Sequence, residues 1–181
     1  MKFLNAVLCF CGVMGFATVA RPAEVVINEI MFHALTHLPG DDWLELHNTG
    51  STPTNLTGWQ ITRGVGFTFN NAIIPAGGYL VVAADVGRFN ARYPAITNVV
   101  GGWVGTLSNT REEIELSNAG GDRVDLVPYA DEGDWAVRQR GPQFSTPPGW
   151  DWLKETDGLG KSIELINAAL PNQYGPNWAA S

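Results

Sequence analysis

Three short segments of the chain share one alternation of apolar and polar residues. The first is Trp43–Asn48 (WLELHN), and related patterns recur at residues 113–118 and 162–167. A period of two is typical of a strand that has one buried face and one exposed face. The repetition predicts equivalent strands of one β-sandwich whose core contains Leu44, Leu46, Leu116 and Leu165.

The remainder of the chain consists of apolar segments separated by frequent turns. Further strands are predicted at residues 25–32, 59–62, 67–69, 79–84 and 123–129. The segment 79–84 is apolar nearly throughout, which indicates a strand covered on both faces. One short helix is predicted near residues 85–93, with Asp85 as its N-cap. Short strands with one brief helix favour an all-β, antiparallel sandwich over a parallel α/β fold.

Residues 1–20 have the layout of a secretory signal peptide. Lys2 supplies a positive charge, an uncharged and mostly apolar run follows, and a small residue, Ala20, stands at the end. Cleavage is expected after Ala20 or nearby, which leaves residues 24–181 as one domain. An uncleaved membrane anchor is the alternative, since the run approaches spanning length. The signal predicts a secreted, periplasmic or cell-surface protein.

Charge and cysteine content narrow the classes of function. The net charge is −7, and it becomes −8 when Lys2 is removed with the signal. An acidic protein offers few cations to phosphates, which argues against binding of nucleic acid. Both cysteines, Cys9 and Cys11, lie inside the signal segment. The mature domain is therefore expected to lack disulfides, thiolate metal sites and cysteine nucleophiles.

A series of short motifs runs in order along nearly the whole mature chain. The motifs are Ile27–His33, Asp42–Asn48, Leu56–Trp59, Pro75–Val81, Leu107–Asn109, Val124–Tyr129, Asp157–Leu165 and Asn177–Trp178. Together they resemble the lamin-tail domain, an immunoglobulin-like β-sandwich. The series is similar to the bacterial secreted branch, which often accompanies kinase or hydrolase domains. The resemblance implies a binding module and carries over no catalytic residue.

The histidines are the first candidates for a metal site. His33 and His37 are close in sequence, and Asp41 or Asp42 could add a carboxylate. Imidazole nitrogens and a carboxylate are ligands that zinc accepts. Solvated loop histidines without a metal are the alternative interpretation.

Two groups of carboxylates are candidates for a calcium site. Matching positions of the three repeated segments hold Glu45, Glu115 and Glu164. If their strands are neighbours, these side chains would attract a cation or raise a carboxylate pKa; solvated glutamates are the alternative. An acidic loop, without the spacing of an EF-hand, contains Asp131, Glu132 and Asp134.

The least regular region, residues 131–152, combines aromatic and basic side chains. Its candidate ligand-binding residues are Trp135, Arg138, Arg140, Trp150 and Trp152. Exposed aromatic residues among polar groups mark recognition surfaces, and indole rings can stack on carbohydrate. The alternative is a long loop that folds over the edge of the sandwich.

These observations predict a non-catalytic, extracytoplasmic binding or adhesion module. Its partner would be a protein or a polysaccharide of the cell envelope, and calcium is the one cofactor considered. Membrane contact is expected only through an uncleaved signal segment. Two alternatives remain: an accessory or truncated part of a larger secreted hydrolase or kinase-like protein, and a metal-dependent hydrolase on the same sandwich. The sequence contains no Gly-x-Ser-x-Gly motif for acyl transfer.

Overall fold

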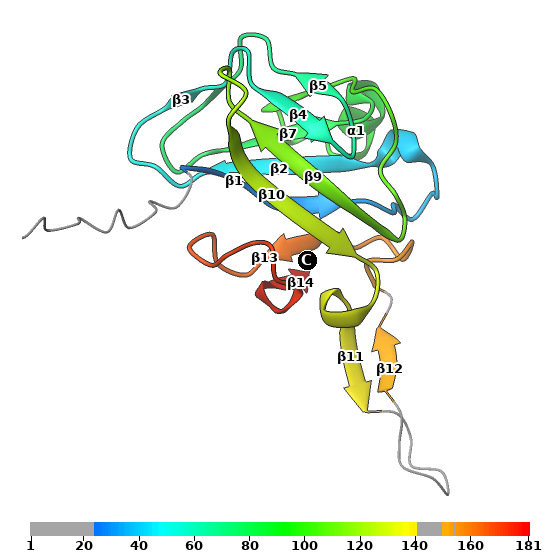
Figure 1. The fold of residues 1–181 in the computed structure, drawn as a ribbon. Coiled ribbons are helices and arrows are strands. Elements are labelled where there is room, and N and C mark those ends of the chain that lie inside the picture. Colours follow the sequence, from blue (N-terminus) through cyan, green and yellow to red (C-terminus); the bar gives the residue numbers. More distant parts are fainter. Residues whose placement is uncertain (1–23, 141–149, 154) are drawn as a thin grey trace, which may run out of the picture.

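The computed structural model describes residues 24–140, 150–153 and 155–181. Two packed β-sheets form the body of the molecule (Figure 1). The larger sheet has the order β14-β13-β1-β2-β7-β8. Its strands are β1 (Val25–Met31), β2 (Trp43–Asn48), β7 (Tyr79–Ala83), β8 (Val99–Gly101), β13 (Ile163–Leu165) and β14 (Trp178–Ala180).

The smaller sheet covers one face of the larger sheet and has the order β10-β9-β4-β5. Its strands are β4 (Gln60–Arg63), β5 (Phe67–Thr68), β9 (Arg111–Ser117) and β10 (Arg123–Ala130). Two separate strand pairs join β3 (Thr54–Asn55) to β6 (Ile73–Ile74) and β11 (Val137–Arg140) to β12 (Trp150–Leu153). The ladders of the described residues are antiparallel except that of β7 and β8, which is parallel. The all-β, immunoglobulin-like sandwich expected from the sequence is confirmed.

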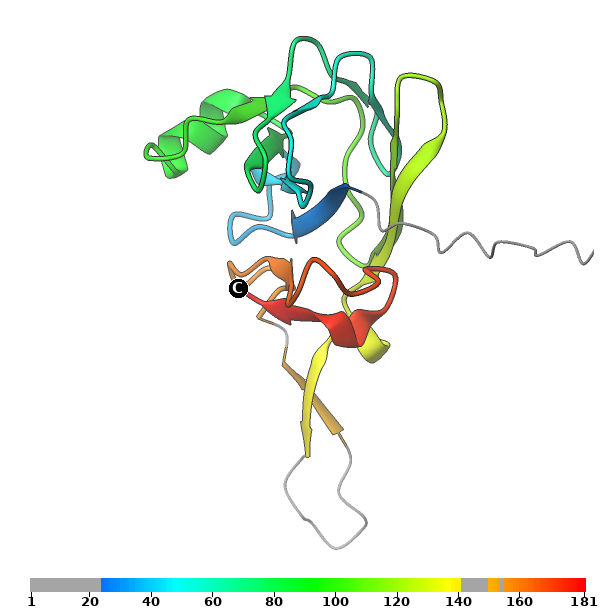
Figure 2. The ribbon, with the colours of Figure 1, turned by 90° about the vertical axis from the view of Figure 1, so that its left-hand side faces the viewer.

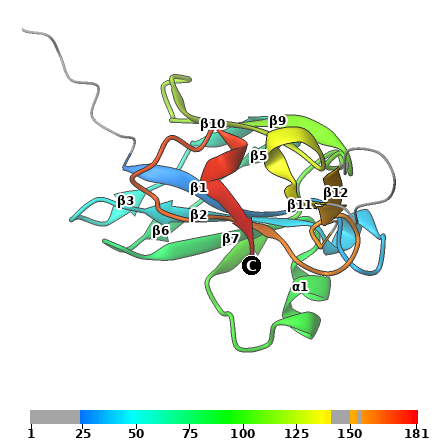
Figure 3. The same ribbon diagram turned by 90° about the horizontal axis from the view of Figure 1, so that it is seen from below.

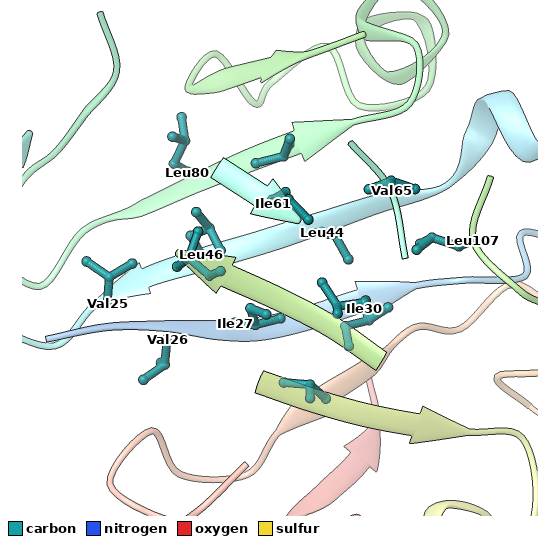
Figure 4. Packing of buried hydrophobic residues seen from close by; sticks show 14 of the residues in the cluster. Val25, Val26, Ile27, Ile30, Leu44, Leu46, Ile61, Val65, Leu80 and Leu107 are labelled. Atoms are coloured by element: carbon teal, nitrogen blue, oxygen red, sulfur yellow. The ribbon is translucent and has the colours of Figure 1, made fainter. Parts of the chain in front are cut away.

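The alternating leucines form the centre of the core, as their spacing predicts. Leu44, Leu46 and Leu116 are fully buried and Leu165 is 4% exposed. Figure 4 shows Leu44 and Leu46 on β2 beside Ile27 and Ile30 on β1. The alternation of side chains along a strand places these residues between the sheets and sends their polar neighbours outward.

The one α-helix of the described residues, α1 (Val86–Arg92), covers the opposite face of the larger sheet (Figure 3). It begins at the predicted cap, because the Asp85 side chain accepts a hydrogen bond of 3.1 Å from the backbone N–H of Arg88. Phe89 on its inner side packs in a second apolar cluster with Trp43 and Val81. Strand β7 is therefore buried on both faces, which explains its continuous apolar sequence.

The three repeated segments do not occupy equivalent places in the sandwich. β2 and β13 belong to the larger sheet with β1 between them, whereas β9 belongs to the smaller sheet. The repeated pattern reports only that each strand has one buried face. It carries no information about which strands become neighbours.

The described part of the region after β10 does not form a long loop over the sandwich edge, which was the alternative expected from the sequence. It continues through the 3₁₀ turn η2 (Gly133–Trp135) into the antiparallel pair β11 and β12. This two-stranded ribbon projects away from the two sheets (Figures 1 and 2). The remaining 3₁₀ turns of the described residues are η1 (Pro39–Asp41) and η3 (Gly175–Asn177).

Candidate functional site

The ribbon brings together four of the five residues predicted to bind a ligand. Its register pairs Arg138 with Trp152 and Arg140 with Trp150. Directly paired residues of an antiparallel ladder share a face, and so do residues two apart along one strand. The register therefore assigns these two arginine and two tryptophan positions to one face of the ribbon, which we call the Arg/Trp face.

Trp135, the fifth predicted residue, lies outside the two strands of the ribbon. It lies at the base of the ribbon in η2 and packs against Trp178 with ring centroids 5.9 Å apart. Trp178 is buried in the main core and donates a hydrogen bond of 2.8 Å to the carbonyl of Asn172. Trp135 thus attaches the start of the ribbon to the edge of the sandwich.

The acidic loop does not form a cage for calcium. The Glu132 side chain is 69% exposed and lies 3.5 Å from the guanidinium of Arg111. Within the described residues, no group of three or more His, Cys, Asp or Glu side chains is placed to hold a metal ion. The structure therefore gives no support to calcium at Asp131, Glu132 and Asp134.

His33 and His37 do come together, but with a different carboxylate from those the sequence suggested. His33 Nε2 is 2.7 Å from Nδ1 of His37, and His33 Nδ1 is 2.7 Å from Oδ1 of Asp157. Because a carboxylate accepts, His33 donates through Nδ1 to Asp157; in the neutral imidazole, Nε2 then accepts from His37. Glycine is favoured at position 158 because its φ is +75°, and a Cβ there would also lie 2.6 Å from Cε1 of His37.

Asp41 and Asp42 are engaged elsewhere. Asp41 forms an ion pair with Arg88, and this guanidinium lowers the pKa of the Asp41 carboxyl. Burial raises the pKa of the Asp42 carboxyl to about 7, although a hydrogen bond from the backbone of Ala34 acts to lower this pKa. The proposed pairing of either aspartate with the histidines is therefore wrong, because the chain returns at Asp157 to supply that carboxylate.

Three glutamates do lie side by side on neighbouring strands, but Glu29 takes the place expected for Glu115. Glu45 on β2 pairs with Glu29 on β1, and Glu29 pairs with Glu164 on β13. Glu115 lies on the smaller sheet, 3.4 Å from the guanidinium of Arg63, and accepts from Thr62. Glu29 was missed because the register of β1 shifts between Ile27 and Glu29, which interrupts its alternation.

Two of these carboxyls are held in their neutral form more strongly than ordinary glutamates. Burial raises the pKa of Glu45 to about 7, and repulsion by Glu29 and Glu164 acts in the same direction. Burial also raises the pKa of Glu29, although the Ser162 hydroxyl donates to its carboxylate. Like charges on directly opposed strand positions repel, so protonation of a carboxyl reduces the electrostatic repulsion among these three glutamates.

The row borders a pocket of about 250 Å³ on the outer face of the larger sheet. The helix α1 and the segment that leads into β13 form its two sides. Its lining includes Glu29, Glu45, Trp43, Phe89, Tyr93 and Ser162. Acidic and aromatic side chains thus line a single recess.

We predict that replacing Glu45 with glutamine makes the protein less sensitive to alkaline pH. The folded-state pKa of about 7 exceeds the ordinary value of 4.5, so the folded state binds more protons between these values. The stability from this proton is complete below pH 4.5 and is lost as pH rises through 7. After allowance for solvent screening, wild type should lose about 1–2 kcal/mol more than the variant. Urea unfolding at pH 4.5 and pH 8 measures this difference.

A glutamine at the exposed Glu132 serves as the control for this prediction. That variant should follow the wild-type pH profile, because it retains the Glu45 carboxyl. Asp42 titrates in both proteins, so its effect cancels in the comparison. An equal pH dependence in wild type and the Glu45 variant would contradict the assignment of the proton to Glu45.

Comparison with known families identifies the sandwich. The sequence model of the Lamin Tail Domain family matches residues 18–131, which is more than half of the 181-residue chain. The chain belongs to the lamin tail domain family. This is a family of immunoglobulin-like, non-enzymatic domains. The matched range of this lamin tail domain contains β1 to β10, and the ribbon and the strands β13 and β14 follow it.

No curated protein matches the chain. No helix in the described ranges is both long and apolar enough to cross a bilayer.

Proposed function

We propose that this lamin tail domain is a non-catalytic binding module that acts outside the cytoplasm. The family is non-enzymatic, and the first residues have the composition of a secretory signal. The metal-dependent hydrolase considered from the sequence has no supporting cluster in the described residues. The single observation that carries the proposal is the Arg/Trp face of the projecting ribbon.

The residues of this face indicate the chemistry of the partner. Tryptophan offers a flat apolar surface on which a sugar ring can stack, and it is enriched at binding hot spots. Arginine presents a fork of N–H donors that matches carboxylate or phosphate groups. We infer that the partner is a polysaccharide of the cell envelope that carries acidic groups. The Arg/Trp face would contact it well away from the sandwich body.

Retention on insoluble polysaccharides tests the proposal. The purified protein is expected to pellet with alginic acid more than with cellulose, because only alginic acid offers carboxylates to the arginines. Trp150→Ala should reduce retention on alginic acid by about tenfold, as expected for loss of a central aromatic contact. The double variant Arg138→Ala/Arg140→Ala should reduce retention on alginic acid and leave cellulose unchanged.

The opposite face of the same ribbon supplies matched controls. Gln139 and Asp151 pair with each other in the register between the two Arg–Trp pairs, so they occupy the other face. Gln139→Ala and Asp151→Ala should leave retention unchanged. The proposal fails if Trp150→Ala retains full binding, or if Asp151→Ala loses as much.

A further inference from the structure

The pocket beside the glutamate row is lined by both acidic and aromatic side chains. Glu29 and Glu45, which are paired on β1 and β2, line the pocket beside the next pair on the same face, Met31 and Trp43. Trp43 packs against Phe89 and Tyr93, which also line the pocket. The volume of about 250 Å³ is just below the usual range of small-molecule sites. A recess of this size suits a short organic group.

The lining of the pocket includes no Lys, Arg or His of the described residues. Glu45 accepts a hydrogen bond of 3.1 Å from the amide of Asn28, and Glu29 accepts from the hydroxyl of Ser162. No Lys, Arg or His of the described residues forms an ion pair with either carboxyl, and the charges that act on Glu45 are those of other glutamates. A cation placed between Glu29 and Glu45 would remove their repulsion.

The aromatic side chains of the pocket pack against one another. Trp43 contacts Phe89 and Tyr93 edge to face, with centroid distances of 5.9 and 6.1 Å. Phe89 and Tyr93 lie 4.9 Å apart on the inner side of α1 and at its end. Aromatic faces attract ammonium groups and also cover the apolar carbons attached to them.

Trp43, which lines the pocket, also has an unsatisfied polar group. This side chain is only 8% exposed, and its Nε1 has no hydrogen-bond acceptor among the described residues. A buried N–H without an acceptor is costly, and such groups are rare in folded proteins. Among the described residues, the lining of the pocket therefore includes an indole whose N–H has no acceptor and two carboxyls that have no cationic partner.

We propose that this pocket binds an alkylammonium group. The ammonium would lie between Glu29 and Glu45, and its carbon chain would lie along Trp43, Phe89 and Tyr93. Two sources supply this chemistry: a free alkylamine and a lysine side chain of a polypeptide. The pocket lies on the sandwich and not on the ribbon, so this site and the polysaccharide contact can fail independently.

Titration of the full protein with small probes tests the site. n-Pentylamine represents the free amine, Nα-acetyl-lysine methylamide represents the lysine side chain, and pentan-1-ol is the neutral control. The indole N–H signal of Trp43 in NMR spectra reports occupancy of the pocket. We expect both ammonium probes to bind at least tenfold more tightly than pentan-1-ol. Tighter binding of the lysine probe than of n-pentylamine would identify a polypeptide as the source, and the reverse order would identify a free amine.

Isosteric variants distinguish binding in the pocket from a general attraction of cations to the acidic residues of the sheet. Glu45→Gln and Glu29→Gln should each weaken binding of the ammonium probes about tenfold or more. Glu164→Gln removes a charge from the same row but does not line the pocket, so it should change binding by less than about twofold. The proposal is overturned if pentan-1-ol binds as well as n-pentylamine. Equal effects of Glu164→Gln and Glu45→Gln, or an unchanged Trp43 signal with every probe, would also overturn it.

Discussion

Replacing Leu44 with alanine should lower the free energy of unfolding by about 3 kcal/mol. Leu44 is fully buried at the centre of β2. It pairs across the larger sheet with Ile30 and Val82, and Ile61 of the smaller sheet belongs to the same core cluster. The neighbours are held by sheet hydrogen bonds and cannot close the space, so a cavity adds to the lost burial. Urea unfolding measures the change as a lower midpoint with an unchanged slope.

An exposed leucine provides the matched control for the core substitution. Leu159 is 64% exposed in the turn before β13, so Leu159→Ala should change stability by less than about 0.5 kcal/mol. A loss below about 1 kcal/mol for Leu44→Ala would mean that the two sheets do not pack as described. That result would contradict the sandwich itself.

The second large effect is expected at Asp125, which connects the two sheets. Its carboxylate accepts a hydrogen bond of 2.7 Å from the backbone N–H of Ile27 and one of 2.5 Å from the amide of Asn172. Ile27 lies on β1 of the larger sheet, whereas Asp125 belongs to β10 of the smaller sheet. Burial raises the pKa of Asp125, while these hydrogen bonds act against that shift. One carboxylate thus joins β1, β10 and the C-terminal segment.

Asp125→Ala should destabilise the protein by about 3 kcal/mol, since two partly buried donors lose their acceptor. Thermal and urea unfolding measure the loss. Asp125→Asn retains one oxygen acceptor and should lose less. Asp122→Ala, at the exposed turn between β9 and β10, is the control and should cost less than about 0.5 kcal/mol. Equal stabilities of the Asp125→Ala and Asp122→Ala variants would rule out this connection between the sheets.

Local patterns allowed the main elements to be predicted. The alternation in Trp43–Asn48 fixes which of its residues face the core, because the side-chain period of a strand is a property of the backbone. The apolar run of β7 indicated cover on both faces, and α1 supplies the second cover. Asp85 is found as the helix cap because its hydrogen bond to Arg88 spans only three residues.

The candidate sites were predicted less completely, because each depends on residues distant in sequence. The Arg/Trp face was predicted as a set of residues, and the register of β11 with β12 then gave it geometry. His33 and His37 were found four residues apart, but Asp157 comes from the other end of the chain. Trp135 carried the same sequence signal as Trp150, and only its contact with Trp178 shows that it belongs to the sandwich edge.

The sequence by itself determined the longer strands of the two sheets, their buried faces, the helix cap and the family. These follow from short-range order, since backbone geometry repeats every two residues in a strand and every 3.6 in a helix. The tertiary structure alone decided that Glu29 would stand between Glu45 and Glu164, and that α1 would close a pocket beside them. Which strands become neighbours depends on how the entire chain closes its two sheets, and no local pattern records that.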